Sequence, residues 1–523
     1  MPARHAVPIA LGVRLRIMVL GLSAALLGGC GSLPSLADRS PSTALADTHD
    51  TRLGRAIAPR AAAHPGKSGV YPLLDSRNAF AARVLLARAA ERSLDVQYYI
   101  WRPDLSGTLL FEALHEAAER GVRVRLLLDD NNTAGLDETL AALTGHPNIE
   151  VRLFNPFVTR QARWLGYLTD FPRLNRRMHN KSFTVDNQAT IIGGRNVGDA
   201  YFGATEGVVF VDLDVMAVGP VVQAVSHDFD RYWSSASAYP VDRLLPPAAP
   251  ARISALASQA SLIEREPAAR SYMDALRESP FVRELLEGRL RFEWASTHMV
   301  SDDPAKGLGR VDGETMLPHQ LERIIGEPRT HVDLVSAYFV PTKTGTEALT
   351  ALARDGVEIR ILTNALEATD IAIVHAGYAK WRKALLQAGI RLYELKRLSP
   401  RLERHADSGR FGSSGASLHA KTFSVDHARV FIGSFNFDPR SARLNTELGF
   451  IIESPTLAKD IEDAFNDHIP QEAYEVHLSD TGDLYWIERH DDRLLRHDTE
   501  PGASLWKRAV VWFASLLPIE WLL

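Results

Sequence analysis

The sequence predicts an α/β fold made of two copies of one unit, which share a single site at a pseudo-twofold interface. Three observations support this prediction. Strands alternate with helices along the 523 residues, the order of these elements recurs in the second half, and one polar motif occupies the same point of each half. Alternation of strands with helices is typical of mostly parallel sheets flanked by helices, so we expect that arrangement in both units.

The first copy begins with a strand at residues 92–101 (RSLDVQYYIW). An amphipathic helix that ends at Gly121 follows, then a strand at 122–131, a second helix and a strand at 149–155. Apolar residues at helical spacing with a glycine at the end indicate the helix, and short apolar runs rich in valine and leucine indicate the strands.

The second copy repeats this order. Strands are predicted at 330–340, 357–365 and 390–396, and the helix between the first two ends at Gly356. Self-similarity over this distance is a sign of a duplicated unit.

The repeat sets the expected domain boundaries. The first domain is predicted at residues 71–250 and the second at 311–475, with an insertion at 251–310 that has no counterpart in the first half. Residues 476–523 form a C-terminal segment whose apolar end carries three tryptophans. This end suits either a membrane-interfacial segment or a terminal helix docked on the body.

The first 30 residues have the layout of a secretory signal. A basic start precedes an apolar run at 17–27, which is too short to span a bilayer comfortably, and small residues lead to Cys30. The LGGC sequence resembles a bacterial lipobox, which implies a lipidated Cys30 and a membrane-associated, periplasm-facing lipoprotein of a bacterial envelope; an uncleaved signal anchor is the alternative. Gly31 favours the outer membrane, by resemblance to Gram-negative sorting rules. Residues 31–70 are expected to be a flexible tether.

Composition narrows the classes of function. A single cysteine excludes an intramolecular disulfide framework and a cysteine-based zinc cluster. The net charge of −5 and the pI of about 6.4 provide no broad basic surface, so nucleic acid is not an expected partner. No carboxylate cluster has metal-ligand spacing, so we expect neither a metal nor another cofactor.

One polar motif occurs twice, 240 residues apart, as HNKSFTVDNQATIIGGRN and HAKTFSVDHARVFIGSFN. A single His-x-Lys-x4-Asp is weak evidence, but two copies at matching points of a repeat indicate function rather than an incidental core hairpin. The residues at matching offsets are His179, Lys181, Asp186, Gly193 and Asn196 in the first copy and His419, Lys421, Asp426, Gly433 and Asn436 in the second.

These residue types suit phosphoryl transfer. Alternation along a strand puts each histidine and the lysine two residues later on one face. Lysine and asparagine donors can hold the non-bridging oxygens of a phosphate. One histidine can attack phosphorus to give a phosphohistidine, and the other can protonate the leaving oxygen and deprotonate the incoming nucleophile. Asp186 and Asp426 begin a turn, so we expect them to hold the turn and the strand register through hydrogen bonds.

A nucleophilic imidazole needs an acceptor on its other nitrogen. A carboxylate follows each motif, Asp212 in FVDLDVMAVGP and Glu447 in NTELGFIIESP. Aligning these segments on Pro220 and Pro455 places the two carboxylates opposite each other. We predict that they are the acceptors; a solvated or capping carboxylate is the alternative.

The doubled motif resembles that of the phospholipase D superfamily. The resemblance covers nearly the whole chain from about residue 70, and segments such as RLNRRMHNKSFTVD, SDDPAKG and FIGSFNFDPRSARLNTE look like bacterial cardiolipin synthases of the C type. One departure is Gly193-Gly194, where the superfamily usually has Gly-Ser, whereas the second motif keeps Gly433-Ser434. The loss of one hydroxyl predicts two unequal halves.

The resemblance implies a phosphatidyltransferase that makes cardiolipin from phosphatidylglycerol and a second phospholipid, with phosphatidylethanolamine as donor. The implied partners are these phospholipids and a membrane surface, and the need for a small accessory protein stays open. The aromatic, arginine-rich loop at 155–177 suits either contact with anionic head groups or ordinary packing. Alternatives to the transferase are a hydrolytic phospholipase D or phosphodiesterase and a non-catalytic lipid-binding lipoprotein; both motifs are intact, which argues against the last.

Overall fold

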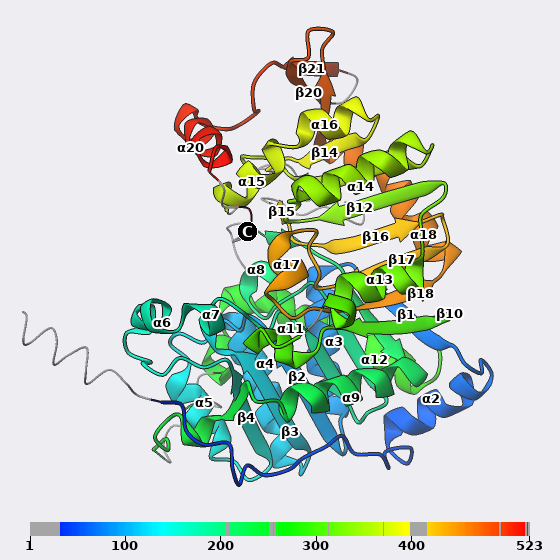
Figure 1. Cartoon of the computed structure of the whole chain (residues 1–523). Coiled ribbons are helices and arrows are strands. Elements are labelled where there is room, and N and C mark those ends of the chain that lie inside the picture. Colours follow the sequence, from blue (N-terminus) through cyan, green and yellow to red (C-terminus); the bar gives the residue numbers. More distant parts are fainter. Residues whose placement is uncertain are drawn as a thin grey trace, which may run out of the picture.

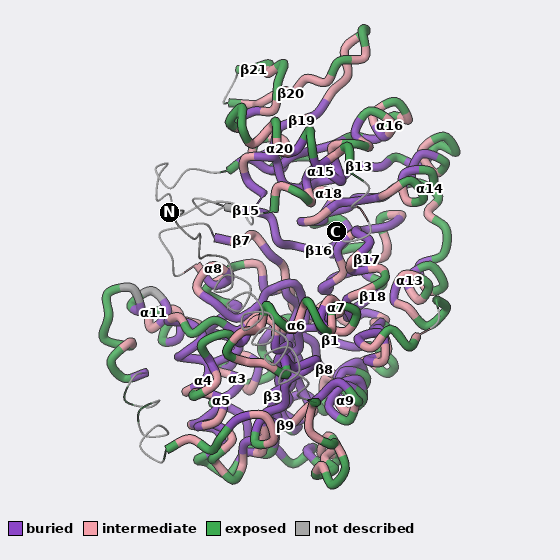
Figure 2. Tube along the Cα trace, turned by 60° about the vertical axis from the view of Figure 1, so that its left-hand side comes forward, coloured by how far each residue is buried: buried purple, intermediate pink, exposed green. Residues whose placement is uncertain are grey.

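Two large sheets, one from each half of the chain, form the frame of the molecule (Figure 1). Buried residues follow the strands of both sheets and the zone where the halves meet (Figure 2). The predicted signal, Cys30 and Gly31 lie outside the described residues. The computed structural model describes residues 32–203, 209–249, 255, 258, 260–311, 313–369, 371–397, 416–490, 493–517 and 520.

The first sheet has nine strands in the order β10-β1-β8-β6-β5-β2-β3-β4-β9. Strands β2, β3 and β4 run parallel, and the other neighbours pair antiparallel. The strands are β1 (Ser68–Leu73), β2 (Ser93–Tyr98), β3 (Arg123–Asp129), β4 (Ile149–Phe154), β5 (Ser182–Val185), β6 (Ala189–Gly193), β8 (Asp214–Val218), β9 (Ala238–Pro240) and β10 (Glu293–Ala295).

The second sheet repeats this plan with ten strands in the order β11-β18-β17-β16-β12-β13-β14-β19-β20-β21. Strands β12, β13 and β14 are its parallel set. The strands are β11 (Thr297–Ser301), β12 (His331–Ser336), β13 (Glu358–Asn364), β14 (Arg391–Leu395), β16 (Lys421–Val425), β17 (Arg429–Gly433), β18 (Leu448–Glu453), β19 (Ala473–Leu478), β20 (Leu484–His490) and β21 (Arg493–His497).

Helices flank both sheets, as predicted, and α4 and α14 connect parallel strands. Both connecting helices stop just before a glycine with left-handed backbone, Gly121 (φ +91°) and Gly356 (φ +95°). The helices are α2 (Arg52–Ala62), α3 (Ser76–Ala89), α4 (Leu105–Glu119), α5 (Asp137–Thr144), α6 (Arg163–Thr169), α7 (Phe171–Leu174), α8 (Asp199–Phe202), α9 (Pro220–Trp233), α11 (Arg270–Glu278), α12 (Phe281–Leu286), α13 (Leu317–Ile325), α14 (Thr342–Arg354), α15 (Ala372–Ala379), α16 (Arg382–Gln387), α17 (Pro439–Arg443), α18 (Pro455–Asp463), α19 (Ile469–Glu472) and α20 (Leu505–Ser515).

The α/β class and the two repeats are confirmed, but the sheets are mixed rather than mostly parallel. Within these two sheets, parallel pairing holds only where a helix carries the chain back to the start of the next strand. The motif strands β5 and β6, and likewise β16 and β17, are joined by tight turns, and a tight turn forces antiparallel pairing.

The inter-repeat segment belongs to both sheets. Its strand β10 pairs with β1 of the first sheet, and β11, only two residues later, pairs with β18 of the second. The predicted insertion at 251–310 is therefore a structural link between the repeats and not an appendage.

Residues 31–70 were predicted to be a flexible tether, but part of this segment is a helix packed on the first domain. Residues 52–62 form helix α2, capped by the Thr51 side chain, and this helix buries Leu53 and Ile57 against the first domain. The four-residue spacing of those two apolar side chains puts them on one helical face, so burial stabilises the segment. No helix in the described part of the chain is long and apolar enough to cross a membrane.

Candidate active site

Each motif forms a β-hairpin that begins at the same edge of its sheet. Strand β5 runs antiparallel to β2 and pairs its first residue, Ser182, with Gln97 near the end of β2. In the second sheet Lys421 pairs with Ser336, the last residue of β12. His179 and His419 therefore lie where the parallel strands end, which we call the carboxyl edge.

The aspartates of the motifs hold these hairpins from the opposite end. The Asp186 carboxylate accepts hydrogen bonds of 2.7–3.3 Å from the backbone N–H groups of residues 91–93. Asp426 accepts equivalent bonds of 2.8–3.3 Å from residues 329–331. Both aspartates have positive φ, near +50°, at the turn. This geometry fits a role in fixing turn and register, away from the histidines.

The histidines and their carboxylate acceptors are exchanged between the repeats. His179 Nδ1 donates to Glu447 Oε2 over 2.8 Å, and His419 Nδ1 donates to Asp212 Oδ2 over 2.5 Å. Lys421 Nζ also lies 2.9 Å from His419 Nδ1. Because a carboxylate holds each Nδ1 proton, the lone pair of each neutral imidazole lies on Nε2.

Backbone pairing across the interface produces this exchange. The segment before His179 forms a parallel bridge with the other repeat, Met178 to Thr446, and His179 N donates to Thr446 O over 2.9 Å. On the other side, β15 (Ala416–Leu418) pairs with β7 (Val209–Val211), and His419 N donates to Val211 O over 2.8 Å. Each histidine is thus placed next to the acceptor that follows the other motif.

The two half-sites are chemically unequal. Ser434 Oγ donates to Glu447 Oε2 over 2.5 Å, so this carboxylate is held by a hydroxyl as well as by His179. The counterpart of Ser434 is Gly194, where a Cβ would lie only 2.1 Å from Asp212 Oδ1. The Asp212 carboxylate fills the space that a serine would need.

Burial sets the charge states of the site. Burial lowers the pKa of His419 to about 4, with Lys421 adding to the effect, and lowers the pKa of His179 well below its ordinary value. Burial raises the pKa of Glu447 to about 7. For Asp212 burial also acts upward, but His419 and Lys421 outweigh it, so its pKa lies below the ordinary value.

The motif lysines and asparagines lie in the same buried site. Lys181 Nζ donates to His179 O, and burial lowers the pKa of this lysine well below its usual value. Asn196 Oδ1 accepts from Ile100 N over 3.2 Å, whereas its Nδ2 is buried without a partner among the described residues. Asn436 likewise keeps one buried amide atom unpartnered within the described chain. Such atoms are suited to a bound ligand.

Sequence reasoning missed the aromatic rings that pack on the histidines. Tyr99 meets His179 edge to face at 4.8 Å between ring centres, and Tyr201 meets His419 in the same way at 5.2 Å. Phe210 lies 5.1 Å from His419. Tyr99 directly follows β2 and Tyr201 lies within the short helix α8, and neither position carries a local signal of contact with a histidine.

A buried ion pair from the inter-repeat segment supports the Glu447 half-site. Lys306 Nζ donates to Asp302 Oδ2 over 2.8 Å and to Ser441 O over 2.9 Å. The same Asp302 oxygen accepts from Glu447 N over 3.0 Å. The SDDPAKG segment therefore fixes the backbone at Glu447, just before β18, a role that its sequence did not reveal.

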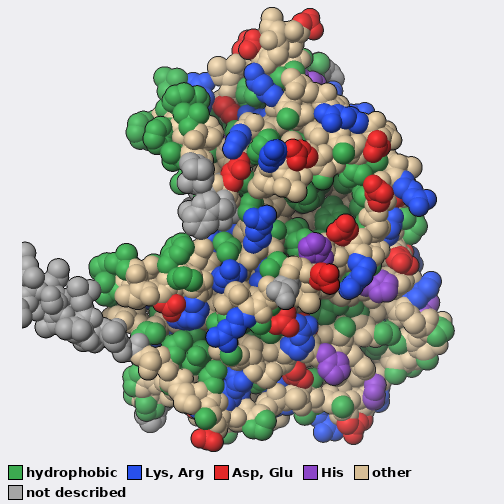
Figure 3. Space-filling model, in the orientation of Figure 1, with side chains coloured by type: hydrophobic (Ala, Val, Ile, Leu, Met, Phe, Trp, Pro, Cys, Tyr) green, Lys and Arg blue, Asp and Glu red, His purple; other side chains and the backbone are tan. Residues whose placement is uncertain are grey.

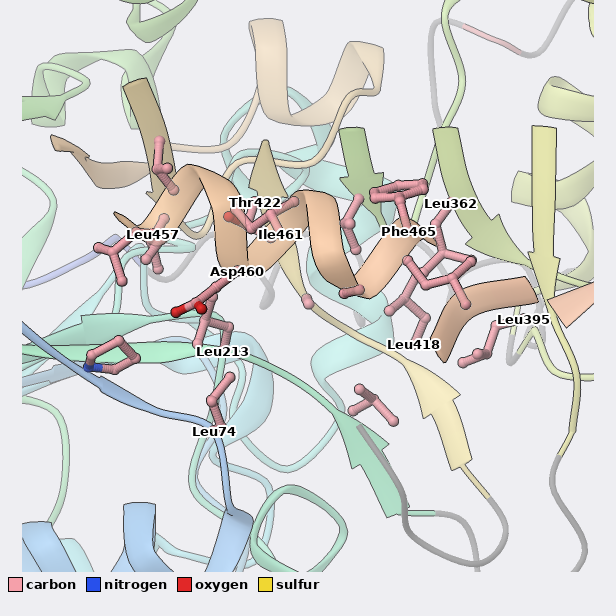
Figure 4. A pocket seen from close by; sticks show the side chains of 18 of the residues that line it. Leu74, Leu213, Leu362, Leu395, Leu418, Thr422, Leu457, Asp460, Ile461 and Phe465 are labelled. Carbon is pink, nitrogen blue, oxygen red and sulfur yellow. The ribbon is translucent and has the colours of Figure 1, made fainter. Parts of the chain in front are cut away.

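An apolar pocket lies behind the strand that carries His419 (Figure 4). Leu418 and Thr422 line it with Ile461 and Phe465, whereas His419 alternates to the other side. No motif histidine or lysine lines this pocket, so it is not the reaction centre. In the described part of the chain, no three His, Cys, Asp or Glu side chains gather as they would around a metal ion.

Comparison with known proteins identifies the class. The model of the family described as "Cardiolipin synthase, PLD-like domain" matches residues 85–233 and 321–469, one match in each repeat. The structure of phosphatidylserine synthase from Haemophilus influenzae Rd KW20 superposes with a TM-score of 0.55 at 14% identity, covering 89% of this chain and 99% of that one. At that identity the likeness concerns the fold alone. The chain belongs to the family of phospholipase D-like cardiolipin synthases and is an enzyme of the phosphatidyltransferase class.

Individual relatives sharpen this assignment. Cardiolipin synthase C of Escherichia coli strain K12 is 53% identical over 472 residues, which cover 90% of this chain and all of that protein. Cardiolipin synthase A of Cronobacter sakazakii is 25% identical over 401 residues, which cover 76% of this chain and 68% of the relative. The match to the C type thus extends well beyond the two motifs.

Proposed function

We propose that the chain makes cardiolipin by moving a phosphatidyl group from phosphatidylethanolamine to phosphatidylglycerol through a phosphohistidine. The observation that carries the proposal is the exchanged pairing of His179 with Glu447 and His419 with Asp212, which joins both histidines in one buried site. The 53% identity to a cardiolipin synthase C supports the choice of product.

The first step cleaves the donor lipid. Nε2 of one histidine attacks phosphorus, the bond from phosphorus to the ethanolamine oxygen breaks, and the other histidine gives its proton to that oxygen. Burial lowers the pKa values of both imidazoles. The negative phosphodiester raises the basicity of its neighbours when it binds, which supplies the protonated histidine.

The second step reverses this chemistry with a new alcohol. The second histidine removes the proton from a glycerol hydroxyl of phosphatidylglycerol, whose oxygen then attacks phosphorus and breaks the P–N bond. Lys181 and Lys421 stabilise the charge that develops on the non-bridging oxygens, and Asn196 and Asn436 add neutral donors.

An assay with a labelled donor lipid tests the donor and the reaction together. The purified chain receives phosphatidylethanolamine labelled in its acyl chains and unlabelled phosphatidylglycerol, without added metal. We expect labelled cardiolipin and free ethanolamine, formed without any accessory protein. The matched controls are His179→Ala, His419→Ala and the exposed Lys459→Ala on α18, which should keep its activity.

The other outcomes separate the rivals. Labelled phosphatidic acid alone would identify a hydrolase. Unlabelled cardiolipin would show that phosphatidylglycerol is also the donor. Activity that requires cell extract would show that a small accessory protein is needed, and no turnover of either lipid would refute the proposal.

We also propose that Cys30 carries a lipid anchor and holds the protein at the periplasmic side of the outer membrane. The LGGC sequence and the glycine that follows it support this proposal. Cells fed radioactive palmitate should label the full-length chain but not Cys30→Ser. Labelling that survives the substitution would contradict lipidation of Cys30. Fractionation of the envelope would show whether the protein is held by the inner or the outer membrane.

A further inference from the structure

Two apolar surfaces, one on each repeat, protrude at the carboxyl edge near the active site. The α6 surface consists of Trp164, Leu165, Leu168 and Phe171, with Leu168 75% exposed and Trp164 64% exposed. The α20 surface consists of Leu505, Trp506, Trp512, Phe513 and Leu516, all at least 61% exposed.

Topology places both surfaces on the side where the histidines lie. Helix α6 follows the carboxyl end of β4. Helix α15 follows the carboxyl end of β13, and α20 packs on α15 through Val511 and Ala514. The two surfaces project on the same side in Figure 1, and both come forward in Figure 2. In the space-filling view they form two green projections, above and below a recess (Figure 3).

The exposed face of α20 is unlike that of a helix in water. Its exposed residues from 504 to 517 include no charged side chain, whereas Lys507 and Arg508 are only half-exposed. A soluble helix normally turns its apolar face inward, so this one calls for a cover that the described residues do not supply. Large aromatic and aliphatic residues with flanking basic ones are the composition of an interfacial membrane helix.

Two arginines where the repeats meet favour an anionic surface as the cover for the apolar residues. Arg176 and Arg443, from the two repeats, meet beside α7, where Arg176 Nη1 donates to Arg443 O over 3.0 Å. Arg176 also donates to the neutral Lys306 O, and Arg443 is exposed. Anionic head groups complement such arginines.

We propose that the α6 and α20 surfaces dock together into the surface of an anionic phospholipid bilayer. The docking rests on the proposed function, because it brings the site to lipids that never leave the membrane. A flat bilayer touches both projections at once, whereas a small partner would cover one. The docking therefore makes access to the recess depend on both repeats.

A single labelled cysteine tests each surface in the full chain. In a Cys30→Ser background, Leu168→Cys, Phe513→Cys and Lys459→Cys each carry an environment-sensitive dye. Lys459 is the control, because it is exposed on α18, at the far side of the second repeat (Figure 1). The probe membranes are vesicles of phosphatidylethanolamine and phosphatidylglycerol, with bromine on the acyl chains for quenching.

We expect blue-shifted, about twofold stronger emission and bromine quenching at positions 168 and 513, with no change at 459. Vesicles of pure phosphatidylcholine should give a response several times weaker. Quenching at only one of the two positions would overturn the joint docking. A response without vesicles that grows with protein concentration would overturn it in favour of a second copy as the cover. No turnover is needed for this readout, so failure of cardiolipin synthesis would be seen separately.

Discussion

The two half-sites share one motif but hold their histidines by different means. His179 relies on Glu447, which Ser434 supports, whereas His419 relies on the shorter Asp212, which lies against Gly194. The difference in length is compensated by the difference in the facing residue, so each carboxylate reaches its Nδ1. A duplicated site can therefore keep its geometry while its two halves acquire different proton affinities.

The two carboxylates differ in their affinity for a proton. Glu447 has a pKa of about 7, raised by burial, and the pKa of Asp212 lies below its ordinary value because His419 and Lys421 outweigh burial. Glu447 therefore changes its charge near neutral pH, whereas Asp212 stays ionised there. The two half-sites therefore differ in the pH range over which their carboxylates titrate.

Removing either histidine should have the largest effect. We expect His179→Ala and His419→Ala each to lower turnover by roughly 10⁴-fold, because nucleophile and proton carrier act as a unit. A donor lipid with a p-nitrophenol head group needs no proton for departure. One variant should then release p-nitrophenol in a burst and the other should not, which assigns the nucleophile. Equal rescue of both variants would mean that the halves are equivalent.

Neutralising an acceptor should cost roughly 10³-fold, by analogy with removal of the carboxylate from a catalytic triad. Glu447→Gln should abolish the downfield Nδ1 proton resonance that is also missing from His179→Ala, and Asp212→Asn should do so for His419. Glu453→Gln, an exposed residue at the end of β18, the strand that follows Glu447, is the control. Loss of the resonance of the other histidine would contradict the exchanged pairing.

Adding a side chain at Gly194 should lower activity roughly a hundredfold, since small displacements of catalytic groups have effects of that size. In Gly194→Ser the new Cβ would displace the Asp212 carboxylate from His419. The reciprocal Ser434→Gly creates no clash and should lose less. Steady-state transfer rates of the two variants measure which loses more activity. A Gly194→Ser variant as active as Ser434→Gly would show that the close approach of residue 194 to Asp212 is unimportant.

Removing the Ser434 hydroxyl should have the smallest effect, roughly tenfold for one hydrogen bond to a charged group. The hydroxyl lowers the pKa of Glu447, so Ser434→Ala raises it further. Activity requires ionised Glu447 and rises with pH through that pKa. The acid limb of the kcat/KM profile, near pH 7 in the parent chain, should move to higher pH. If the acid limb does not move, the group that titrates there is not Glu447.

Local sequence signals predicted the parts of the site that lie on one hairpin. Two features of the first motif are local: the two-residue spacing of His179 and Lys181, and the turn at Asp186. Their recurrence in the second motif made both predictions stronger. Aligning the two halves also found Asp212 and Glu447. Their exchange between the repeats was not predictable, because it depends on long-range contacts. His419 and Asp212 are 207 positions apart in the sequence, and His179 and Glu447 are 268 positions apart.

Other differences have physical reasons of the same kind. The mixed sheets follow from tight turns that the strand–helix alternation concealed. Helix α2 was overlooked because its composition resembles a linker, although Leu53 and Ile57 are spaced for one buried face. The support that Asp302 and Lys306 give to Glu447 joins three distant segments and leaves no local pattern.

The exchange of acceptors also governs when reactivity first arises during the life of the chain. A newly made first repeat has His179 but lacks Glu447, which is still to be synthesised 268 residues later. The first repeat alone therefore lacks the carboxylate that orients His179 in the whole chain. Neither half-site is complete until the two repeats have packed together, because each takes its carboxylate from the other.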